Sequence, residues 1–186
     1  MIEVRFFEDK MTYFGPELRP HFILSRFRVE GSALIAFRGP CEVKTDHLVD
    51  WEDRLQNDSI RAAEMVHFLG EFFGMTLKEG IWTQRLIVSE ILAHLLQKGI
   101  SATRSGDDLF VSGKKLSVSI VTASPVSVLL HLGLNVDPTG APVSAVGLLD
   151  LMTEAGVSEL ITRVLSRFQD EYQSVERAAV KVRPVI

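Results

Sequence analysis

Alternating and continuous runs of apolar residues open the chain. Residues 2–7 alternate apolar and charged positions, which predicts a strand. A second apolar run covers residues 33–37 and ends at residues 38–40, Arg-Gly-Pro, as is typical of a short buried strand. Between the two strands, residues 17–27 could form a helix. Proline is tolerated only in the first turn of a helix, so this helix should start near Pro20.

Two helical patterns follow. In the first, which begins at Asp58 or Ser59 as the N-cap and closes at Gly74, apolar residues recur at helical spacing. The second covers residues 83–98, carries one apolar stripe and ends at Gly99. We therefore expect two consecutive helices in the middle of the chain.

The pattern then changes to strands. Residues 109–111 and 116–122 are rich in β-forming residues and flank Ser112-Gly113, which predicts a hairpin. Residues 126–136 form another long apolar strand candidate, and residues 157–180 form a long helix with one apolar face. This order of elements favours an α+β fold, in which helices cover one face of a mixed, mostly antiparallel sheet.

Composition narrows the class of protein. With 186 residues, 46% hydrophobic and 24% charged, and no internal repeat or long linker, residues 1–186 are expected to form a single globular domain. The net charge of -4 gives no general attraction to nucleic acid or to an anionic membrane. Cys41 is the single cysteine, no secretory pattern opens the sequence, and no apolar stretch approaches the roughly 20 residues that span a bilayer. We expect a cytoplasmic location.

The segment from Arg104 to Asn135 carries the main candidate chemistry. Strand geometry places alternate residues on opposite faces, so Lys115, Ser117 and Ser119 should share one face. The opposite face, expected to be the core face, would hold Leu116, Val118 and Ile120. A lysine beside small hydroxyl residues could bind a carboxylate or a phosphate. The alternative is a solvated lysine pair, Lys114 and Lys115, at the tip of a hairpin.

The same segment resembles a motif of known enzymes. Residues 107–109, Asp-Asp-Leu, and residues 114–117, Lys-Lys-Leu-Ser, are similar to the central motif of biotin and lipoate protein ligases, an Asn-Asp-Leu strand followed by a turn and a lysine-bearing strand. The resemblance implies that Lys115 contacts an acyl-adenylate, as in lipoate ligases. It places Arg104 where biotin ligases carry their lysine, and Asp107 where the family has asparagine.

Later segments extend the resemblance. Residues 130–136 resemble a ligase strand that ends in Gly-hydrophobe-Asn-hydrophobe, and residues 146–151 resemble the lipoate-ligase stretch before the last helix. These motifs imply the catalytic-domain fold that the ligases share with class II aminoacyl-tRNA synthetases. The whole chain, including residues 39–43 and 119–127, looks most like a small uncharacterised family of that superfamily, the domain of unknown function 366.

The first half of the chain departs from the ligase pattern. It lacks the glycine-rich nucleotide loop of the ligases and offers only Arg38 to Lys44, followed by Asp46-His47. ATP and Mg²⁺ are therefore cofactors by resemblance only, with Asp107 and Asp108 as candidate contacts for Mg²⁺ or for ligand hydroxyls. The full set of candidate ligand-binding residues is Arg38, Arg104, Asp107, Asp108, Ser117, Ser119, Ser124, His131 and Asn135.

Three functions remain open from the sequence. The first is an adenylate-forming or acyl-transfer enzyme in which Lys115, helped by Arg104, orients a small ligand through its carboxylate or phosphate and stabilises negative charge. The second is a non-catalytic small-molecule-binding protein on the same scaffold. The third is a metal-dependent hydrolase or lyase that uses Cys41, Asp46 and His47, although a polar loop with a partly buried cysteine is the simpler interpretation. A homodimer formed through a sheet edge is an expectation by family analogy.

Overall fold

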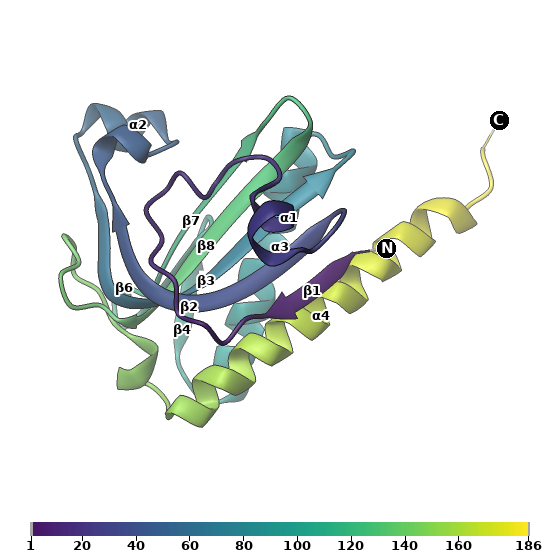
Figure 1. The fold of residues 1–186 in the computed structure, drawn as a ribbon. Coiled ribbons are helices and arrows are strands. Elements are labelled where there is room, and N and C mark those ends of the chain that lie inside the picture. The colour runs from purple at the N-terminus through teal and green to yellow at the C-terminus, as the bar shows by residue number, and fades with distance from the viewer. Residues whose placement is uncertain (1, 186) are drawn as a thin grey trace.

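The computed structural model describes residues 2–185, which form an α+β fold around a five-stranded sheet (Figure 1). The strand order is β1-β2-β3-β8-β7, in which β1 and β2 are parallel and every other pair is antiparallel. The strands are β1 (Glu3–Phe6), β2 (Ala33–Val43), β3 (Ile60–Phe73), β7 (Ser117–Ala123) and β8 (Ser127–Asp137). The mixed, mostly antiparallel sheet expected from the sequence is confirmed.

A small second sheet stands beside the edge strand β7. Its order is β4-β5-β6, and its strands are β4 (Ala102–Ser105), β5 (Asp108–Val111) and β6 (Lys114–Lys115). The Ser112-Gly113 turn between β5 and β6 has positive φ at both residues, as a tight hairpin turn requires. The expected hairpin is thus correct for its first strand and its turn. Its second strand was wrong, because only Lys114 and Lys115 pair with β5. After Leu116 the chain continues as β7, which pairs with β8.

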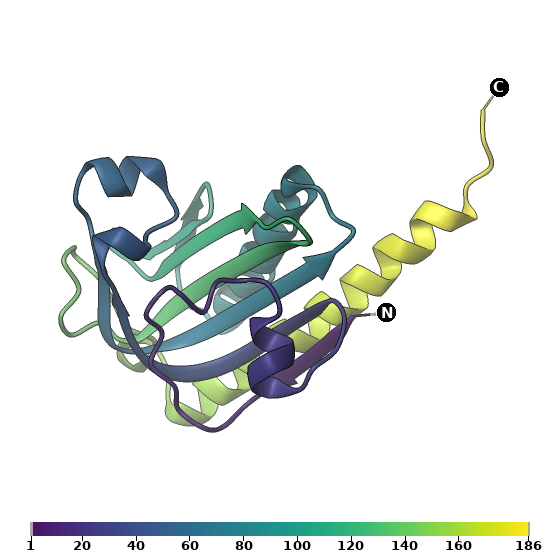
Figure 2. The ribbon, with the colours of Figure 1, turned by 45° about the horizontal axis from the view of Figure 1, so that its top comes forward.

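Two long helices cover one face of the large sheet (Figures 1 and 2). α3 (Leu77–Gln97) begins at a capping box in which the Thr76 side chain and the Glu79 side chain satisfy each other's backbone N–H groups. α4 (Glu154–Lys181) lies alongside β1 and continues past the sheet edge. The shorter helices are α1 (Phe22–Phe27), α2 (Trp51–Leu55), η1 (Thr45–His47) and η2 (Leu148–Asp150). Within residues 2–185 no helix combines the length and apolarity that crossing a membrane requires.

The large sheet separates two hydrophobic clusters. The cluster under α3 and α4 takes alternate residues of the central strands, Leu34, Val66, Phe68, Leu132 and Leu134 among them, with Phe168 from α4. The cluster on the other face takes the intervening residues, among them Ile35, Phe37, Met65 and Leu69, and it is covered by α1 and by the segment before it. The strands are therefore buried on both faces.

Burial on both faces explains the largest error of the sequence interpretation. The helix expected from Asp58 to Gly74 was wrong, because the segment forms the 14-residue strand β3. A strand that is apolar on both faces shows no alternation, and its run of apolar residues also fits helical spacing. The helix expected over residues 17–27 is reduced to the six residues of α1.

The strand expected over residues 33–37 continues to Val43, through Gly39 and Pro40. It does so through a register shift between Gly39 and Cys41, where an irregular ladder tolerates proline. A Cβ on Gly39 would lie 2.0 Å from the carbonyl oxygen of Met11, so only glycine allows this close approach of the N-terminal segment. The approach places Tyr13 against the sheet, where it forms a parallel bridge with Cys41.

Candidate functional site

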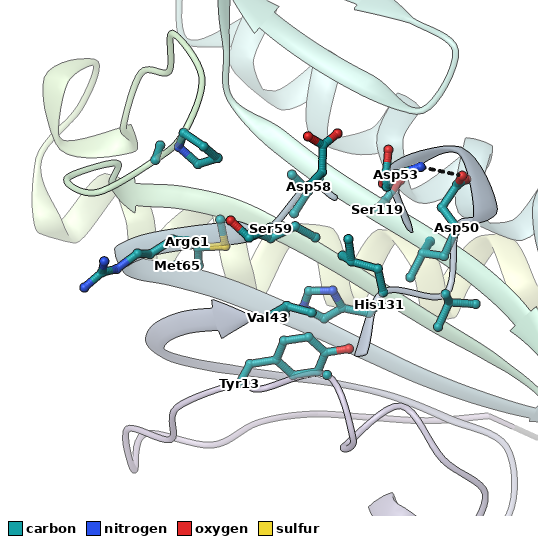
Figure 3. A pocket seen from close by; sticks show the side chains of 18 of the residues that line it. Tyr13, Val43, Asp50, Asp53, Asp58, Ser59, Arg61, Met65, Ser119 and His131 are labelled. Atoms are coloured by element: carbon teal, nitrogen blue, oxygen red, sulfur yellow. Dashed lines mark hydrogen bonds between the residues drawn. The ribbon is translucent and has the colours of Figure 1, made fainter. Parts of the chain in front are cut away.

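A cavity of about 350 Å³ opens on the face of the large sheet that α3 and α4 do not cover (Figure 3). Its floor comes from β3, β7 and β8, through Met65, Val118, Ile120 and His131. The small sheet, the segment around α2 and residues 141–145 form its rim. A cavity of this size, with an apolar floor and a polar rim, suits a small organic molecule.

Lys115 lies in the cavity wall. Pairing with Phe110 on β5 and a bridge to Ala145 fix its backbone, and its side chain is about one-third exposed. Its Nζ atom lies 2.9 Å from the Asp108 carboxylate, which also lines the cavity. The only lysine of the lining is therefore paired in the described structure, and an anionic ligand would have to share it with Asp108.

Asp107 is held in place by three neighbours. Its Oδ2 atom accepts hydrogen bonds from the Ser119 hydroxyl at 2.8 Å and the Gln84 amide at 3.0 Å, and its Oδ1 atom lies 3.1 Å from the Arg85 guanidinium. Gln84 and Arg85 come from α3, so Ser119 points toward the helix side of the sheet. The Asp107 side chain therefore links the small sheet to α3.

Only part of the arrangement expected around β7 is found: Lys115 and Ser119 line the cavity and Leu116 is buried in the core, but Ser117 does not reach the cavity. Ser117 is fully buried, and its hydroxyl accepts a hydrogen bond from the Leu109 backbone N–H at 2.8 Å. Val118 and Ile120, expected on the core face, line the cavity on the side away from α3 and α4, where Val118 also packs against the second hydrophobic cluster. The strand alternates as predicted, but the alternation does not say which face carries the helices, and both faces of this sheet are covered.

Two of the expected cationic contacts lie elsewhere. Arg38 donates to Glu64 at 3.0 Å and to Glu154 at 2.6 Å, and so ties β2 and β3 to the N-terminus of α4. Arg104 donates to the Ser89 hydroxyl at 2.7 Å on α3. Neither residue lines the cavity.

Of the remaining candidates, Ser124 also lies outside the cavity, because its hydroxyl bonds with Ser127 in the turn between β7 and β8. Asn135 and His131 both line it. The Asn135 amide donates to the Lys115 carbonyl at 3.2 Å, and so connects β8 to the lysine.

A pair of buried histidines lies beneath the cavity. The Nδ1 atom of His67 and the Nε2 atom of His131 are 3.0 Å apart, and the Nε2 atom of His67 lies 3.2 Å from the Gly39 carbonyl oxygen. The Tyr13 ring stacks on His131 with a centroid separation of 3.8 Å and an interplanar angle of 7° (Figure 3). Burial lowers the pKa of His67 to about 4, and burial together with His67 lowers the pKa of His131 well below its usual value. Both imidazoles are therefore neutral at neutral pH.

The charge of the lining is predominantly negative. Five aspartates contribute to it, against one lysine and one arginine: Asp50, Asp53, Asp58, Asp107 and Asp108 against Lys115 and Arg61. Burial, with the neighbouring carboxylates Asp50 and Asp58, raises the pKa of Asp53. An anionic group would be attracted near Lys115 and Arg61 and repelled by the aspartates.

The residues of the metal hypothesis are not brought together as a metal site. Cys41 is fully buried in β2 rather than in a loop, and burial raises its pKa to about 12, so that it stays a thiol. The Nδ1 atom of His47 lies 3.0 Å from the Phe14 carbonyl oxygen. In the part of the chain that the structure describes, no group of three or more His, Cys, Asp or Glu side chains could hold a metal ion.

Sequence reasoning missed His67 and Tyr13. His67 is not among the candidates from the sequence, because the segment from Asp58 to Gly74 was expected to be helical. Read as a strand, the same segment places Met65, His67 and Leu69 on one face, opposite Asn135, Gly133 and His131 of β8. For Tyr13, which lies in a segment without regular structure, no local signal was available.

Comparisons with known proteins agree with this fold. A family model described as a domain of unknown function (DUF366) matches residues 2–183. An uncharacterised protein of Methanocaldococcus jannaschii is 30% identical over all of this chain and 86% of its own length. A solved protein of unknown function from Pyrococcus horikoshi is 35% identical, with a TM-score of 0.93 and complete coverage of both chains.

More distant solved structures include ligases. A bipartite lipoate protein ligase from Thermoplasma acidophilum has a TM-score of 0.57 at 12% identity, over 91% of this chain and 85% of that one. At this identity the likeness shows the fold alone. The ligase-like fold that the sequence motifs implied is thereby confirmed.

Proposed function

This chain belongs to the DUF366 family, and from that premise we propose that it binds a small carboxylic acid in the cavity, with Lys115 as the contact for the carboxylate. The observation that carries the proposal is the position of Lys115 at the rim of an apolar floor formed by Met65, Val118 and Ile120. Such a site offers a charged contact to one end of a molecule and an apolar surface to its body.

The fold supports the choice of a carboxylic acid. The Thermoplasma acidophilum protein of similar fold is, by its name, a ligase for lipoate, which is a carboxylic acid. The pairing of Lys115 with Asp108 at 2.9 Å sets a condition on this binding. A ligand carboxylate must displace or share the position of the Asp108 carboxylate, so the two compete for one ammonium group.

Binding without catalysis is the form of the proposal that the geometry favours. Adenylation needs cationic groups around a triphosphate. The two other cationic candidates from the sequence, Arg38 and Arg104, are engaged with Glu64, Glu154 and Ser89 outside the cavity. The residues around the cavity, with five aspartates, do not fit the triphosphate of ATP.

A matched set of variants tests the carboxylate contact. Binding of octanoic acid, lipoic acid and biotin is measured by calorimetry and by the shift in melting temperature. Lys115→Ala should weaken binding about 10- to 100-fold, because a hydrogen bond to a charged group is worth about 1.5–3 kcal/mol. Asp108→Asn should strengthen binding by removing the competing carboxylate. Arg104→Ala is the control, because it removes a cation that lies outside the cavity.

The outcome decides between the forms of the proposal. If none of the acids binds, or if Lys115→Ala and Arg104→Ala bind equally well, the carboxylate proposal is wrong. Release of pyrophosphate from ATP and Mg²⁺ in the presence of any of these acids would establish the catalytic form that the geometry disfavours.

A further inference from the structure

The hydrogen-bond directions of the histidine pair follow from one fixed acceptor. A carbonyl oxygen only accepts hydrogen bonds, so the Nε2 atom of His67, 3.2 Å from the Gly39 oxygen, carries its proton. His67 is neutral at neutral pH, so its Nδ1 atom is an unprotonated acceptor. The Nε2 atom of His131, 3.0 Å away, must therefore be the donor.

The same reasoning leaves His131 with an unused acceptor. His131 is neutral and carries its proton on Nε2, so its Nδ1 atom has a free lone pair. Nδ1 makes no hydrogen bond with any residue in the range 2–185. Within that range, only an Arg85 nitrogen and the Nε2 atom of His94 are both inaccessible and without a hydrogen bond. The Nδ1 atom of His131 is not one of them, and His131 lines the cavity, which leaves Nδ1 as the ring nitrogen available to a bound molecule.

The surroundings hold this acceptor in place. His131 is 2% exposed, the Tyr13 ring stacks on one side of it, and His67 fixes the ring rotation through the shared hydrogen bond. A ligand that displaces water from this atom loses free energy unless it supplies a donor in its place. A bound molecule with a donor at this point would satisfy it, and a purely apolar molecule would not.

We propose that the Nδ1 atom of His131 is a recognition contact that accepts a hydrogen bond from an N–H or O–H group of the ligand. This inference deepens the proposed function and rests on it for the ligand as a whole: the bound acid carries a donor group away from its carboxylate. The five aspartates around the cavity favour a neutral or cationic donor, such as a hydroxyl, an amide or an ammonium group, over a second anion.

His131 acts here as an acceptor and not as a general base. A proton taken up at Nδ1 would leave a positive charge buried in the histidine pair. The pair cannot pass the proton on, because its hydrogen bonds end at the Gly39 carbonyl oxygen, which is too weak a base to accept one. The buried position disfavours that charged form strongly. The contact therefore selects ligands without moving a proton.

Ring protonation can be measured without any ligand. In protein labelled with ¹⁵N at histidine, long-range ¹H–¹⁵N spectra at pH 7 should show both His67 and His131 protonated at Nε2 and bare at Nδ1. His67→Phe and His131→Phe assign the signals, and His94→Gln is the control for a histidine outside the cavity. A proton on Nδ1 of His131 would overturn the inference and leave the carboxylate proposal standing.

The second measurement tests the donor. Octanoic acid is compared with its ω-hydroxy and ω-amino derivatives, and the derivatives should bind about three- to tenfold more tightly, the effect of one hydrogen bond. His131→Phe, which keeps an aromatic ring against Tyr13, should abolish this difference. His131→Asn should keep part of it, because its side-chain oxygen can take the place of Nδ1. Equal binding of the three acids to the wild type contradicts the inference.

A probe without a carboxylate separates the two proposals. Pyrrolidinone has a donor N–H, and N-methylpyrrolidinone has none. At high millimolar concentration, only pyrrolidinone should shift the Nδ1 resonance of His131. If it does so while no acid binds in a Lys115-dependent way, the donor subsite is supported and the carboxylate proposal fails. If neither lactam shifts Nδ1 and the acids bind without regard to their donors, the subsite is refuted.

Discussion

The two faces of the large sheet differ in the residues that cover them and in how completely they are filled. Under α3 and α4 the strands contribute an apolar layer that Phe168 and other helix residues close completely. The other face is covered by α1, α2 and irregular segments, with the small sheet at its edge, and it keeps a cavity and two buried histidines. The comparison indicates a division of labour, in which the helix-covered face is mainly an apolar core, with hydrogen-bonded Ser117 and Gln84 as exceptions, and the other face accommodates the cavity and the histidine pair.

The largest expected effect is on the helix-covered face. Phe168 is fully buried and packs edge-on against Phe72 at a centroid separation of 6.1 Å. Phe168→Ala should lower the free energy of unfolding by about 3–5 kcal/mol, because it removes apolar contacts and leaves a cavity. Urea denaturation measures the change.

A matched pair of valines controls for the type of substitution. Val164→Ala on the helix-covered face should cost about 2 kcal/mol, from lost transfer energy and a new void. Val118→Ala should cost less, because Val118 already borders the open cavity. Equal costs for the two valines would contradict the division between the faces.

The sequence predicted the elements of these faces unevenly. The helices around residues 83–98 and 157–180 and the strand at residues 126–136 are present, because each has a single clear period or strong β composition and clear end signals. The strand β3 was missed because burial on both faces removes the alternation that identifies a strand. Of the two strands that are buried on both faces, β8 was predicted from its β-rich composition and the turn signals after it, whereas the apolar residues of β3 also fit helical spacing.

The candidate site shows the same limit. The sequence correctly predicted that Asp107, Asp108 and Lys115 lie near one site. These residues are close in the sequence and belong to one hairpin, so their proximity follows from local structure. The contact between His67 and His131 joins residues 64 positions apart, and it depends on the register of β3 against β8. The register between two strands depends on tertiary contacts. It could not be predicted from the sequence once the segment of β3 had been assigned to a helix.

The next effect, in order of size, is the pH dependence that the histidine pair gives to the cavity face. In the unfolded chain a histidine gains its proton near pH 6.5, whereas burial lowers the pKa of folded His67 to about 4. Between these values the unfolded chain binds more protons, so stability falls as the pH is lowered from about 6.5 toward 4. Each neutral histidine contributes a slope of at most about 1.4 kcal/mol per pH unit.

The variant His67→Phe/His131→Phe isolates this contribution from that of the carboxylates. Denaturation of both proteins at pH 7, 6, 5 and 4 should show a shallower loss of stability in the variant over the acidic steps. Parallel curves for the two proteins would mean that the pair titrates normally in the folded chain and is not held neutral.

A smaller effect concerns the pair itself at pH 7. His67→Phe leaves the Nε2 proton of His131 without its acceptor in a buried position, which should cost about 1–3 kcal/mol. Replacing both histidines by phenylalanine removes donor and acceptor together and should cost less than the sum of the two single variants. Additive costs in the double-mutant cycle would show that the two rings do not exchange a hydrogen bond.

The smallest effect is expected at the rim of the cavity. Lys115 and Asp108 form an ion pair whose side chains are about one-third exposed, so Lys115→Ala should change the free energy of unfolding by less than about 1 kcal/mol. Lys98→Ala, which removes a more exposed pair with Glu159, gives the scale for an ion pair outside the cavity. Urea denaturation at pH 7 compares the two variants. Because Lys115 contributes so little to folding, a large loss of ligand binding in Lys115→Ala would report on the ligand contact, whereas a stability loss as large as that of Val164→Ala would place Lys115 in the framework of the fold.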